Sequence, residues 1–330
     1  MTRPEASPYS VMLRETGGPE VLQMEPLTLR SPGPSQVLVR HEAIGLNFMD
    51  TYVRSGLYPV PLPSGLGNEA AGVVEAVGEK VAGFRKGDHV GYFTAPAGAY
   101  ATHRLIDQDK LVKLPDEISF EQAAAAMLKG CTAEYLIDRC AKVQAGQAVL
   151  VHAAAGGVGS LLVQWLRAIG AQVIAHSGNP QKAALASKLG ADHSLHCPME
   201  ELAKGVRSLT GGEGVPVVLD GVGAASWKAS LESVARRGLI VSYGNASGPV
   251  PPFSPLELTK AGSIFVTRPT LGDYCATPEE MRASAKRLFG LMLEGKLEVR
   301  IGERFPLADV AEAHRAIESR ATTGSTVLIP

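Results

Sequence analysis

Residues 148–169 read AVLVHAAAGGVGSLLVQWLRAI, which predicts a strand, a glycine-rich turn and a helix in immediate succession. The apolar run at its start has the length of a buried strand, and Val158–Ile169 has the apolar spacing of a helix. Between them, Ala154, Gly156 and Gly159 keep the spacing of the dinucleotide fingerprint, with Ala in place of its first glycine. Glycines suit this turn because side chains would hold a pyrophosphate away from the N–H groups at the helix start. The stretch predicts a dinucleotide-binding βαβ unit; the alternative is a tight turn without a ligand.

The rest of the chain changes style near Phe120. Before this point, short β-branched runs such as 36–40, 71–78 and 88–92 are separated by Gly and Pro, which predicts a β-rich domain. After it, strands and helices alternate, as in a parallel sheet with helices on both faces. Strands are expected at Gln172–Ala175, Val215–Asp220, Leu239–Tyr243, Ile264–Thr267 and Ser325–Ile329, and helices at Gln181–Leu189, Glu200–Leu209, Trp227–Arg236, Pro278–Leu293 and Leu307–Ser319.

Composition narrows the class of protein. A chain of 330 residues predicts two domains, and 45% hydrophobic with 20% charged residues is typical of a globular protein. The formal net charge of −1 offers no basic field for a phosphate backbone, so nucleic acid is not expected as a main partner. Four scattered cysteines suit a reducing compartment, and no apolar run is long enough to span a bilayer. With no signal-peptide pattern at the start, these features predict a cytoplasmic protein that does not bind membranes.

The end of the second strand indicates which dinucleotide is bound. An NAD-preferring site places Asp or Glu there to hold the ribose 2′-hydroxyl. Residues 176–179 read HSGN instead, and Lys182 follows in the first turn of the next helix. A missing acid removes repulsion of a 2′-phosphate and a cation adds attraction, so NADPH is predicted. Taken alone, Lys182 could equally be a solvated helix residue.

Taken together, several motifs along nearly the whole chain resemble the medium-chain dehydrogenase/reductase superfamily, and within it the zinc-free quinone oxidoreductases that include zeta-crystallin. They lie at Ile44–Tyr52, Arg54–Pro59, Pro63–Val74, Ser119–Ala125, Leu128–Gly130, Ala153–Gly159, Phe265–Pro269 and Glu318–Ser325. The resemblance implies an α/β fold: a GroES-like β-rich catalytic domain at 1–128 and 272–330, and a doubly wound parallel-sheet (Rossmann) NADP-binding domain at 129–271.

The resemblance also bears on metal. Zinc-dependent members hold a catalytic zinc at positions that look like Asn47, Asn68 and Lys129 here. An amide, a second amide and an ammonium group are not zinc ligands, which are thiolate, imidazole or carboxylate. No Cys precedes Cys131, so the four-cysteine structural lobe is missing as well. An enzyme without a metal is predicted.

A metal-free active site must hold the nicotinamide against an electron-poor acceptor and supply hydrogen-bond donors to its oxygen. The predicted catalytic residues are Asn47, Tyr52 and Lys129, and Asp50 and Tyr58 are predicted to line the substrate pocket. Four of these five residues have a plainer interpretation. Asn47 could be a turn amide, Asp50 a local cap or ion pair, and the two tyrosines packing aromatics.

Further cofactor contacts are implied by the resemblance. The pyrophosphate would lie on the glycine turn, and Ser177, Lys182 and Arg320 would face the adenosine phosphate, while His196 replaces a tyrosine that relatives place near the adenosine. The implied cofactor-binding residues are Ala155, Gly156, Gly157, Val158, Ser177, Lys182, His196, Tyr243, Gly244, Asn245, Phe265, Val266 and Arg320.

The predicted reaction is reduction of a quinone by NADPH without zinc or flavin, as hydride or as single electrons. Two alternatives stay open: an NADPH-dependent enone or alkenal reductase, and an NADPH-binding, crystallin-like protein without turnover. The strand near Phe265 is expected at the edge of the nucleotide-binding sheet, where an open apolar edge invites pairing with a second copy, so a homodimer is predicted.

Overall fold

The computed structural model describes residues 7–319 and 322–330, and the chain forms two compact units. The first unit contains the chain up to Leu128 together with Cys275–Phe289 and Val299–Pro330. The second contains Lys129–Tyr274 and Gly290–Glu298. The sequence placed boundaries after 128 and 271 and assigned all of 272–330 to the first domain. The second division falls three residues later, and Gly290–Glu298 group with the second unit. Tyr274 stacks on Tyr135 of the second unit, with ring centroids 4.6 Å apart.

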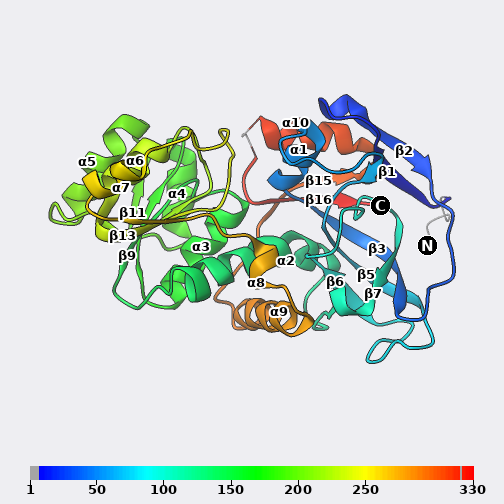
Figure 1. The fold of residues 1–330 in the computed structure, drawn as a ribbon. Coiled ribbons are helices and arrows are strands. Elements are labelled where there is room, and N and C mark those ends of the chain that lie inside the picture. Colours follow the sequence, from blue (N-terminus) through cyan, green and yellow to red (C-terminus); the bar gives the residue numbers. More distant parts are fainter. Residues whose placement is uncertain (1–6, 320–321) are drawn as a thin grey trace. The chain divides into compact units, whose positions relative to one another are not determined.

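The second unit is built on a six-stranded parallel sheet (Figure 1). Its strand order, β11-β10-β9-β12-β13-β14, is that of a doubly wound dinucleotide-binding fold, and the order reverses between β9 and β12. The strands are β9 (Ala148–Val151), β10 (Gln172–His176), β11 (His193–Leu195), β12 (Val215–Asp220), β13 (Val234–Ser242) and β14 (Phe265–Thr267). The predicted α/β fold class is confirmed, and β14 is the edge strand, as expected.

Helices cover this sheet. The helix α3 packs on β9 and β10, α4 packs on β10 and β11, and α6 packs on β12 and β13 while contacting α5. The helices of this unit are α3 (Gly157–Ala168), α4 (Pro180–Lys188), α5 (Met199–Leu209), α6 (Trp227–Ser233), α7 (Pro255–Lys260) and α8 (Leu271–Tyr274). The buried side chains between sheet and helices are aliphatic, with Trp227 at one margin.

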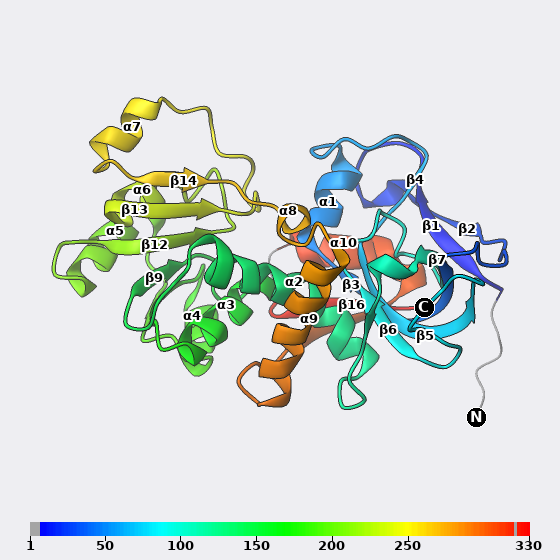
Figure 2. The ribbon, with the colours of Figure 1, turned by 60° about the horizontal axis from the view of Figure 1, so that its bottom comes forward.

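The first unit is β-rich (Figure 2). One sheet has the order β15-β16-β3-β5-β6-β8, with β7 pairing β3, and a small sheet has the order β2-β1-β4. The strands are β1 (Tyr9–Leu13), β2 (Leu22–Pro26), β3 (Gln36–Leu46), β4 (Ser64–Gly65), β5 (Glu69–Val77), β6 (His89–Tyr92), β7 (His103–Asp107), β8 (Val112–Lys113), β15 (Ile301–Pro306) and β16 (Ser325–Ile329). Aliphatic residues of both sheets form its core with Tyr92 and Tyr100.

Four further α-helices are α1 (Phe48–Ser55), α2 (Phe120–Glu134), α9 (Pro278–Leu293) and α10 (Val310–Glu318). A π-helical segment, Tyr135–Cys140, continues α2, and the division between the units falls inside α2, after Leu128. Among residues 7–319 and 322–330, no helix combines the length and the apolar character needed to cross a membrane.

Several features differ from the sequence prediction. The helix α1 was not predicted, because its eight residues follow β3 directly in a region whose sequence is typical of β-structure. The predicted helix Trp227–Arg236 was too long: α6 ends at Ser233, because Val234 already pairs with Val215 in the sheet. The short elements β11, α7 and α8 were not predicted, since three to six residues carry too little periodicity to be recognised.

Candidate active site

The glycine turn lies at the carboxyl end of β9. Gly156 is the N-cap of α3, and Ala155, Gly157 and Val158 flank it, so the predicted pyrophosphate contacts gather where the first N–H groups of the helix point outward. A Cβ on Gly159 would come within 2.2 Å of the Ala153 carbonyl oxygen, so only glycine allows the helix to pack on the turn. This geometry fits a dinucleotide phosphate, which a helix N-terminus attracts through its N–H groups and its dipole.

The end of β10 presents Ser177. Its side chain is 2% exposed, and its hydroxyl has no hydrogen-bond partner within the part of the chain that the structure describes. A buried hydroxyl without a partner is costly, so its position fits contact with a polar ligand. Lys182 lies in the first turn of α4, where Asn179 caps the helix by accepting the Lys182 backbone N–H at 2.9 Å. Partial burial lowers the pKa of Lys182.

The remaining predicted cofactor residues are spread along the same sheet. Tyr243, Gly244 and Asn245 follow β13, and Gly244 packs so closely on Gly221 that a Cβ there would lie 2.4 Å from the Gly221 carbonyl oxygen. His196 is exposed after β11. Arg320 lies outside the described residues.

The residues of the edge strand β14 lie at different distances from the carboxyl edge of the sheet, where ligands bind. Phe265 is its first residue, 62% exposed, and pairs in register with Leu239, whereas ligands of such sheets bind at the carboxyl ends of strands. Val266 comes next, and Thr267 and Arg268 reach the carboxyl edge, where Arg268 donates to the Ser242 carbonyl at 2.9 Å. The sequence prediction omitted these last two residues, because only the strand register shows their level.

In the first unit, Asn47 is the N-cap of α1 and is 3% exposed. The Asp50 carboxylate accepts the Asn47 backbone N–H at 2.9 Å, and the Asn47 side-chain Nδ2 donates to Glu69 Oε2 at 2.8 Å. Nδ2 also lies 3.5 Å from the Gly45 carbonyl oxygen. The amide donor that the sequence assigned to the substrate is therefore engaged inside the protein.

Asp50 itself belongs to a buried polar chain. It is fully buried and also accepts the Tyr100 hydroxyl at 2.8 Å, whose oxygen lies 3.1 Å from His314 Nε2. Arg54 approaches His314 Nδ1 at 3.2 Å and forms an ion pair with Glu318 at 2.6 Å. The geometry matches the helix-cap interpretation of Asp50, while a place in the substrate pocket stays a prediction.

The two predicted tyrosines lie together and are half-buried. Tyr52 on α1 contacts Tyr58 edge-on, with ring centroids 5.2 Å apart, and contacts Phe48 at 5.5 Å. The Tyr58 backbone N–H donates to the Tyr52 carbonyl at 3.0 Å. An aromatic pair of this kind offers an apolar face and two phenol groups.

Lys129 lies on α2 and is 6% exposed. Asn68, another of the positions that hold zinc in relatives, donates from Nδ2 to the Ala95 carbonyl at 2.9 Å. Across residues 7–319 and 322–330, no group of three or more His, Cys, Asp or Glu side chains is placed to hold a metal ion. The amide and ammonium groups at the three positions fit hydrogen bonding better than zinc binding.

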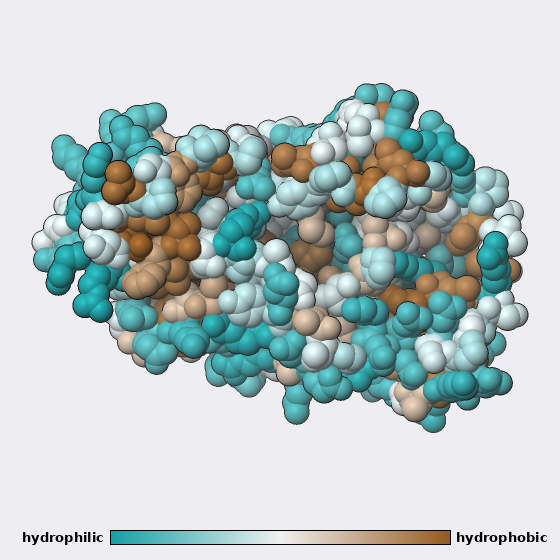
Figure 3. Space-filling view, viewed as in Figure 1, coloured by the Kyte–Doolittle hydropathy of each residue, from teal (hydrophilic) through white to brown (hydrophobic). Residues whose placement is uncertain are grey.

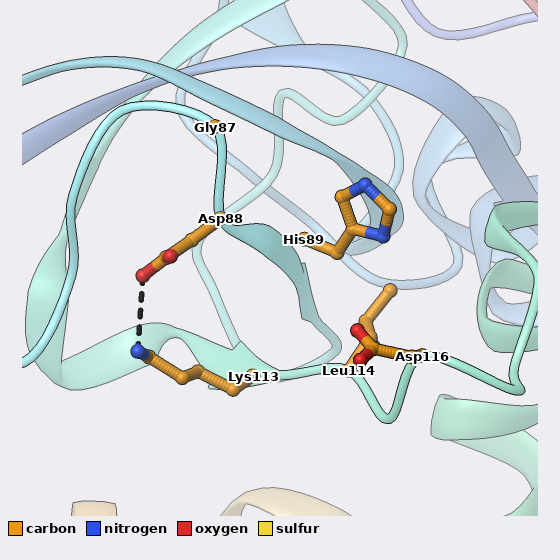
Figure 4. A pocket seen from close by; sticks show the side chains of 6 residues that line it. All are labelled: Gly87, Asp88, His89, Lys113, Leu114 and Asp116. Atoms are coloured by element: carbon orange, nitrogen blue, oxygen red, sulfur yellow. Dashed lines mark ion pairs between the residues drawn. The ribbon is translucent and has the colours of Figure 1, made fainter.

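A polar pocket on the first unit lies apart from these residues (Figure 4). Asp88 and Lys113 form an ion pair there at 3.0 Å, and the His89 ring packs on Phe120. The residues that line this pocket include none of the predicted site residues. It is not the predicted active site.

The parallel sheet, its glycine turn and the separate β-rich unit define a two-domain, dinucleotide-dependent oxidoreductase of the medium-chain type. The family model of zinc-binding dehydrogenases matches residues 157–289, and that of the alcohol dehydrogenase GroES-like domain matches residues 33–116. A quinone oxidoreductase of Pseudomonas aeruginosa is 52% identical over 315 residues, which cover 95% of this chain and 97% of the relative.

Two further relatives also match nearly the whole chain. The solved structure of Escherichia coli quinone oxidoreductase complexed with NADPH has a TM-score of 0.95 at 45% identity and covers 98% of this chain and 100% of its own. A 2-haloacrylate reductase of Burkholderia is 41% identical over 329 residues, 97% of this chain and 98% of the relative. The chain belongs to the quinone oxidoreductase family of the medium-chain dehydrogenase/reductase superfamily.

Proposed function

We propose that the chain reduces quinones with NADPH and uses neither zinc nor flavin. The observation that carries this proposal is the adenosine end of the sheet. Ser177 offers a buried hydroxyl without a partner among the described residues, Lys182 offers a cation in a helix first turn, and residues 176–179 contain no carboxylate. These groups suit a 2′-phosphate, and the Escherichia coli relative is described with NADPH bound.

The residues divide the work between cofactor and acceptor. Gly157 and Val158 would present N–H groups to the pyrophosphate at the start of α3, while the N–H of the N-cap residue Gly156 donates to the Ala153 carbonyl at 2.9 Å. When bound, NADPH supplies two electrons and one proton, and a second proton completes the hydroquinone. The Tyr52 phenol supplies a hydrogen bond to the acceptor oxygen as negative charge develops there. The Lys129 ammonium group acts on the nicotinamide amide, on its ribose or on the acceptor.

Asn47 has a different part in this scheme. Its amide nitrogen is held by Glu69, so its main task is to fix the start of α1, the helix that carries Tyr52. Tyr58 contributes an apolar edge beside Tyr52 against which a flat ring can pack.

A double-bond reductase is the second candidate, because the Burkholderia relative is a 2-haloacrylate reductase. The test is NADPH oxidation by the purified protein with 1,4-benzoquinone, naphthoquinones, cyclic enones and 2-alkenals, compared by kcat/KM. We expect quinones to exceed the other acceptors at least tenfold. Higher values for enones or alkenals would favour the second candidate. If no acceptor is turned over, the remaining alternative is an NADPH-binding protein without enzymatic activity.

The proposal includes a cytosolic homodimer. Within the described residues, the edge strand β14 pairs on one side only, and Phe253, Leu256 and Phe265 are exposed by 36%, 68% and 62%. Figure 3 shows apolar side chains gathered over the part of the second unit where α7 and β13 lie in Figure 1. An apolar strand edge is stabilised by pairing with a second copy. The structure describes all four cysteines and joins none of them in a disulfide, which suits a reducing compartment.

A further inference from the structure

Glu69 is a buried carboxylate that the proposed reaction does not use. It is the first residue of β5 and is fully buried. Oε2 accepts the Asn47 Nδ2 at 2.8 Å, and Oε1 accepts the Leu128 backbone N–H at 2.7 Å. A carboxylate is costly to bury unless strong hydrogen bonds hold it, so these contacts explain how the charge is accommodated.

The surrounding backbone is shaped to this carboxylate. Gly45 of β3 pairs with Glu69 of β5, and a Cβ on Gly45 would lie 2.2 Å from Glu69 Oε2 and 2.3 Å from the Ala124 carbonyl oxygen. Strand β3 and helix α2 therefore close on the carboxylate from two sides, and only glycine leaves room for it. The register between β3 and β5 fixes where the backbone of Glu69 lies, and the close packing leaves its side chain little freedom to move.

The contacts of Glu69 with Asn47 and Leu128 determine which chemical group is suitable at position 69. The Leu128 N–H is a backbone donor, and the Asn47 Nδ2 is the donor end of an amide, so both need an acceptor. A carboxylate provides two acceptor oxygens, whereas the amide of glutamine provides one acceptor and one donor. Glu69 thereby sets which end of the Asn47 amide faces it, and the opposite, accepting end faces the Asp50 backbone N–H in the capping box of α1.

We propose that Glu69 is a positioning residue that orients the Asn47 amide and ties it to the turn of α2 immediately before Lys129. The proposal rests on the proposed function, in which Asn47 and Lys129 serve the reaction. Glu69 links these two segments through one carboxylate.

The first test is Glu69→Gln. The fixed Leu128 N–H claims the single oxygen of the new amide, so its NH₂ group faces the NH₂ group of Asn47, and the Asn47 amide must turn. We expect kcat/KM for 1,4-benzoquinone to fall at least tenfold, mostly in kcat, with unchanged affinity for NADPH measured by fluorescence titration. The matched control is Glu303→Gln, which changes an exposed glutamate in the same unit and should leave both values unchanged.

The decisive test exchanges donor and acceptor across the pair. Asn47→Asp alone sets a second carboxylate against Glu69 and should also lose at least tenfold. When it is combined with Glu69→Gln, the carboxylate introduced at position 47 accepts the NH₂ group of the amide introduced at position 69, and the Leu128 contact is kept. We expect the double variant to regain at least tenfold over the weaker single variant, and the thermal midpoint to recover in parallel.

Losses that simply multiply in the double variant would overturn the proposal, because independent structural damage has no reason to cancel. If Glu69→Gln does not fold, the comparison is between it and the double variant: a folded, active double variant supports the proposal, and an equally unfolded one overturns it. Wild-type protein without quinone turnover would contradict the proposed function alone, since recovery of the thermal midpoint would still test the orientation.

Discussion

Lys182 occupies an electrostatically unfavourable position for a cation. It lies in the first turn of α4, where the helix dipole carries partial positive charge, and that turn has no acidic residue. Its partial burial also lowers its pKa, since desolvation disfavours the charged form. A bound anion beside Lys182 would offset both effects. The Ser177 hydroxyl at the end of β10, which has no partner among the described residues, points to the same anion.

Lys182→Ala is expected to reduce preference for NADPH. The variant loses a charge-assisted contact with the 2′-phosphate, which NADH lacks, so KM for NADPH should rise about tenfold while KM for NADH stays unchanged. Steady-state kinetics with both cofactors measures this. Lys188→Ala, at the other end of the same helix, is the matched control. Equal changes with NADPH and NADH would show that Lys182 does not read the phosphate.

Some residues of the candidate site could be predicted from the sequence, and others could not. The missing acid at 176–179 and the amides at 47 and 68 are visible in the sequence, because each follows from residue type at a fixed motif spacing. Glu69 lies inside the family motif Pro63–Val74, yet its role was missed, since its partner Leu128 lies 59 residues away. Residue type shows available chemistry, whereas orientation depends on tertiary contacts.

At the scale of elements, α1 is held by α10 through the buried polar chain. Arg54 can only donate, so the His314 Nδ1 that faces it must be the acceptor, and Nε2 carries the proton toward Tyr100. The Tyr100 hydroxyl then donates to Asp50. Burial and Asp50 raise the pKa of Tyr100, which keeps this donor protonated. The chain of bonds works only with neutral histidine.

His314 therefore predicts acid sensitivity of the first unit. Burial, followed by the charge of Arg54, lowers its pKa to about 3, from 6.5 for a free histidine. Between these values the unfolded chain binds a proton that the folded chain does not. The contribution of His314 to the free energy of unfolding therefore falls as pH drops below 6.5, by about 1.4 kcal/mol per pH unit, or about 2 kcal/mol at pH 5. His41 of the same unit, whose pKa burial also lowers to about 3, adds a loss of the same sign.

Urea unfolding at pH 7 and pH 5 checks this, with His314→Gln as the variant. We expect wild type to lose stability at pH 5 and the variant, though weaker at pH 7, to lose about 2 kcal/mol less over the same interval. His89→Gln, on the exposed surface, should behave as wild type. An unchanged acid dependence in His314→Gln would show that another group controls it.

Several elements were predictable from their apolar periodicity, although the 15-residue helix α2 was not predicted. The strand β12 and the helix α9 have the bounds expected from their apolar runs, and α3 is displaced by one residue. The helix α1 was missed because Asn47, Asp50 and Thr51 are neutral or poor helix formers, and the cap supplied by Asp50 is recognisable only with hindsight. Local propensity was overridden there by a cap and by the contact with α10.

For the whole molecule, the edge of the sheet in the second unit predicts assembly. Phe265→Lys places a charge on β14, and charged edge residues oppose strand pairing. We expect wild type to elute as a dimer in light-scattering chromatography and the variant to shift toward monomer at the same concentration. Leu293→Lys, an exposed leucine of α9, is the control. A wild-type protein that stays monomeric over a tenfold range of concentration would contradict the dimer.

The two-unit architecture was accessible from sequence because the change from β-rich runs to strand–helix alternation is abrupt near Phe120. The return of the chain to the first unit was harder to locate. Tyr274 stays with the second unit through its stacking on Tyr135, with Arg139 contacting its ring and backbone carbonyl. Such contacts join residues more than a hundred positions apart, so no local sequence pattern predicts them.

Electron transfer from NADPH to a quinone without a metal is the central property proposed for this chain. The most direct measurement is NADPH oxidation with 1,4-benzoquinone by protein dialysed against a strong chelator, with zinc quantified in the same sample. The amides of Asn47 and Asn68 and the ammonium group of Lys129 predict full activity at negligible zinc content. Activity that disappears with the metal and returns on adding zinc would contradict a metal-free reaction.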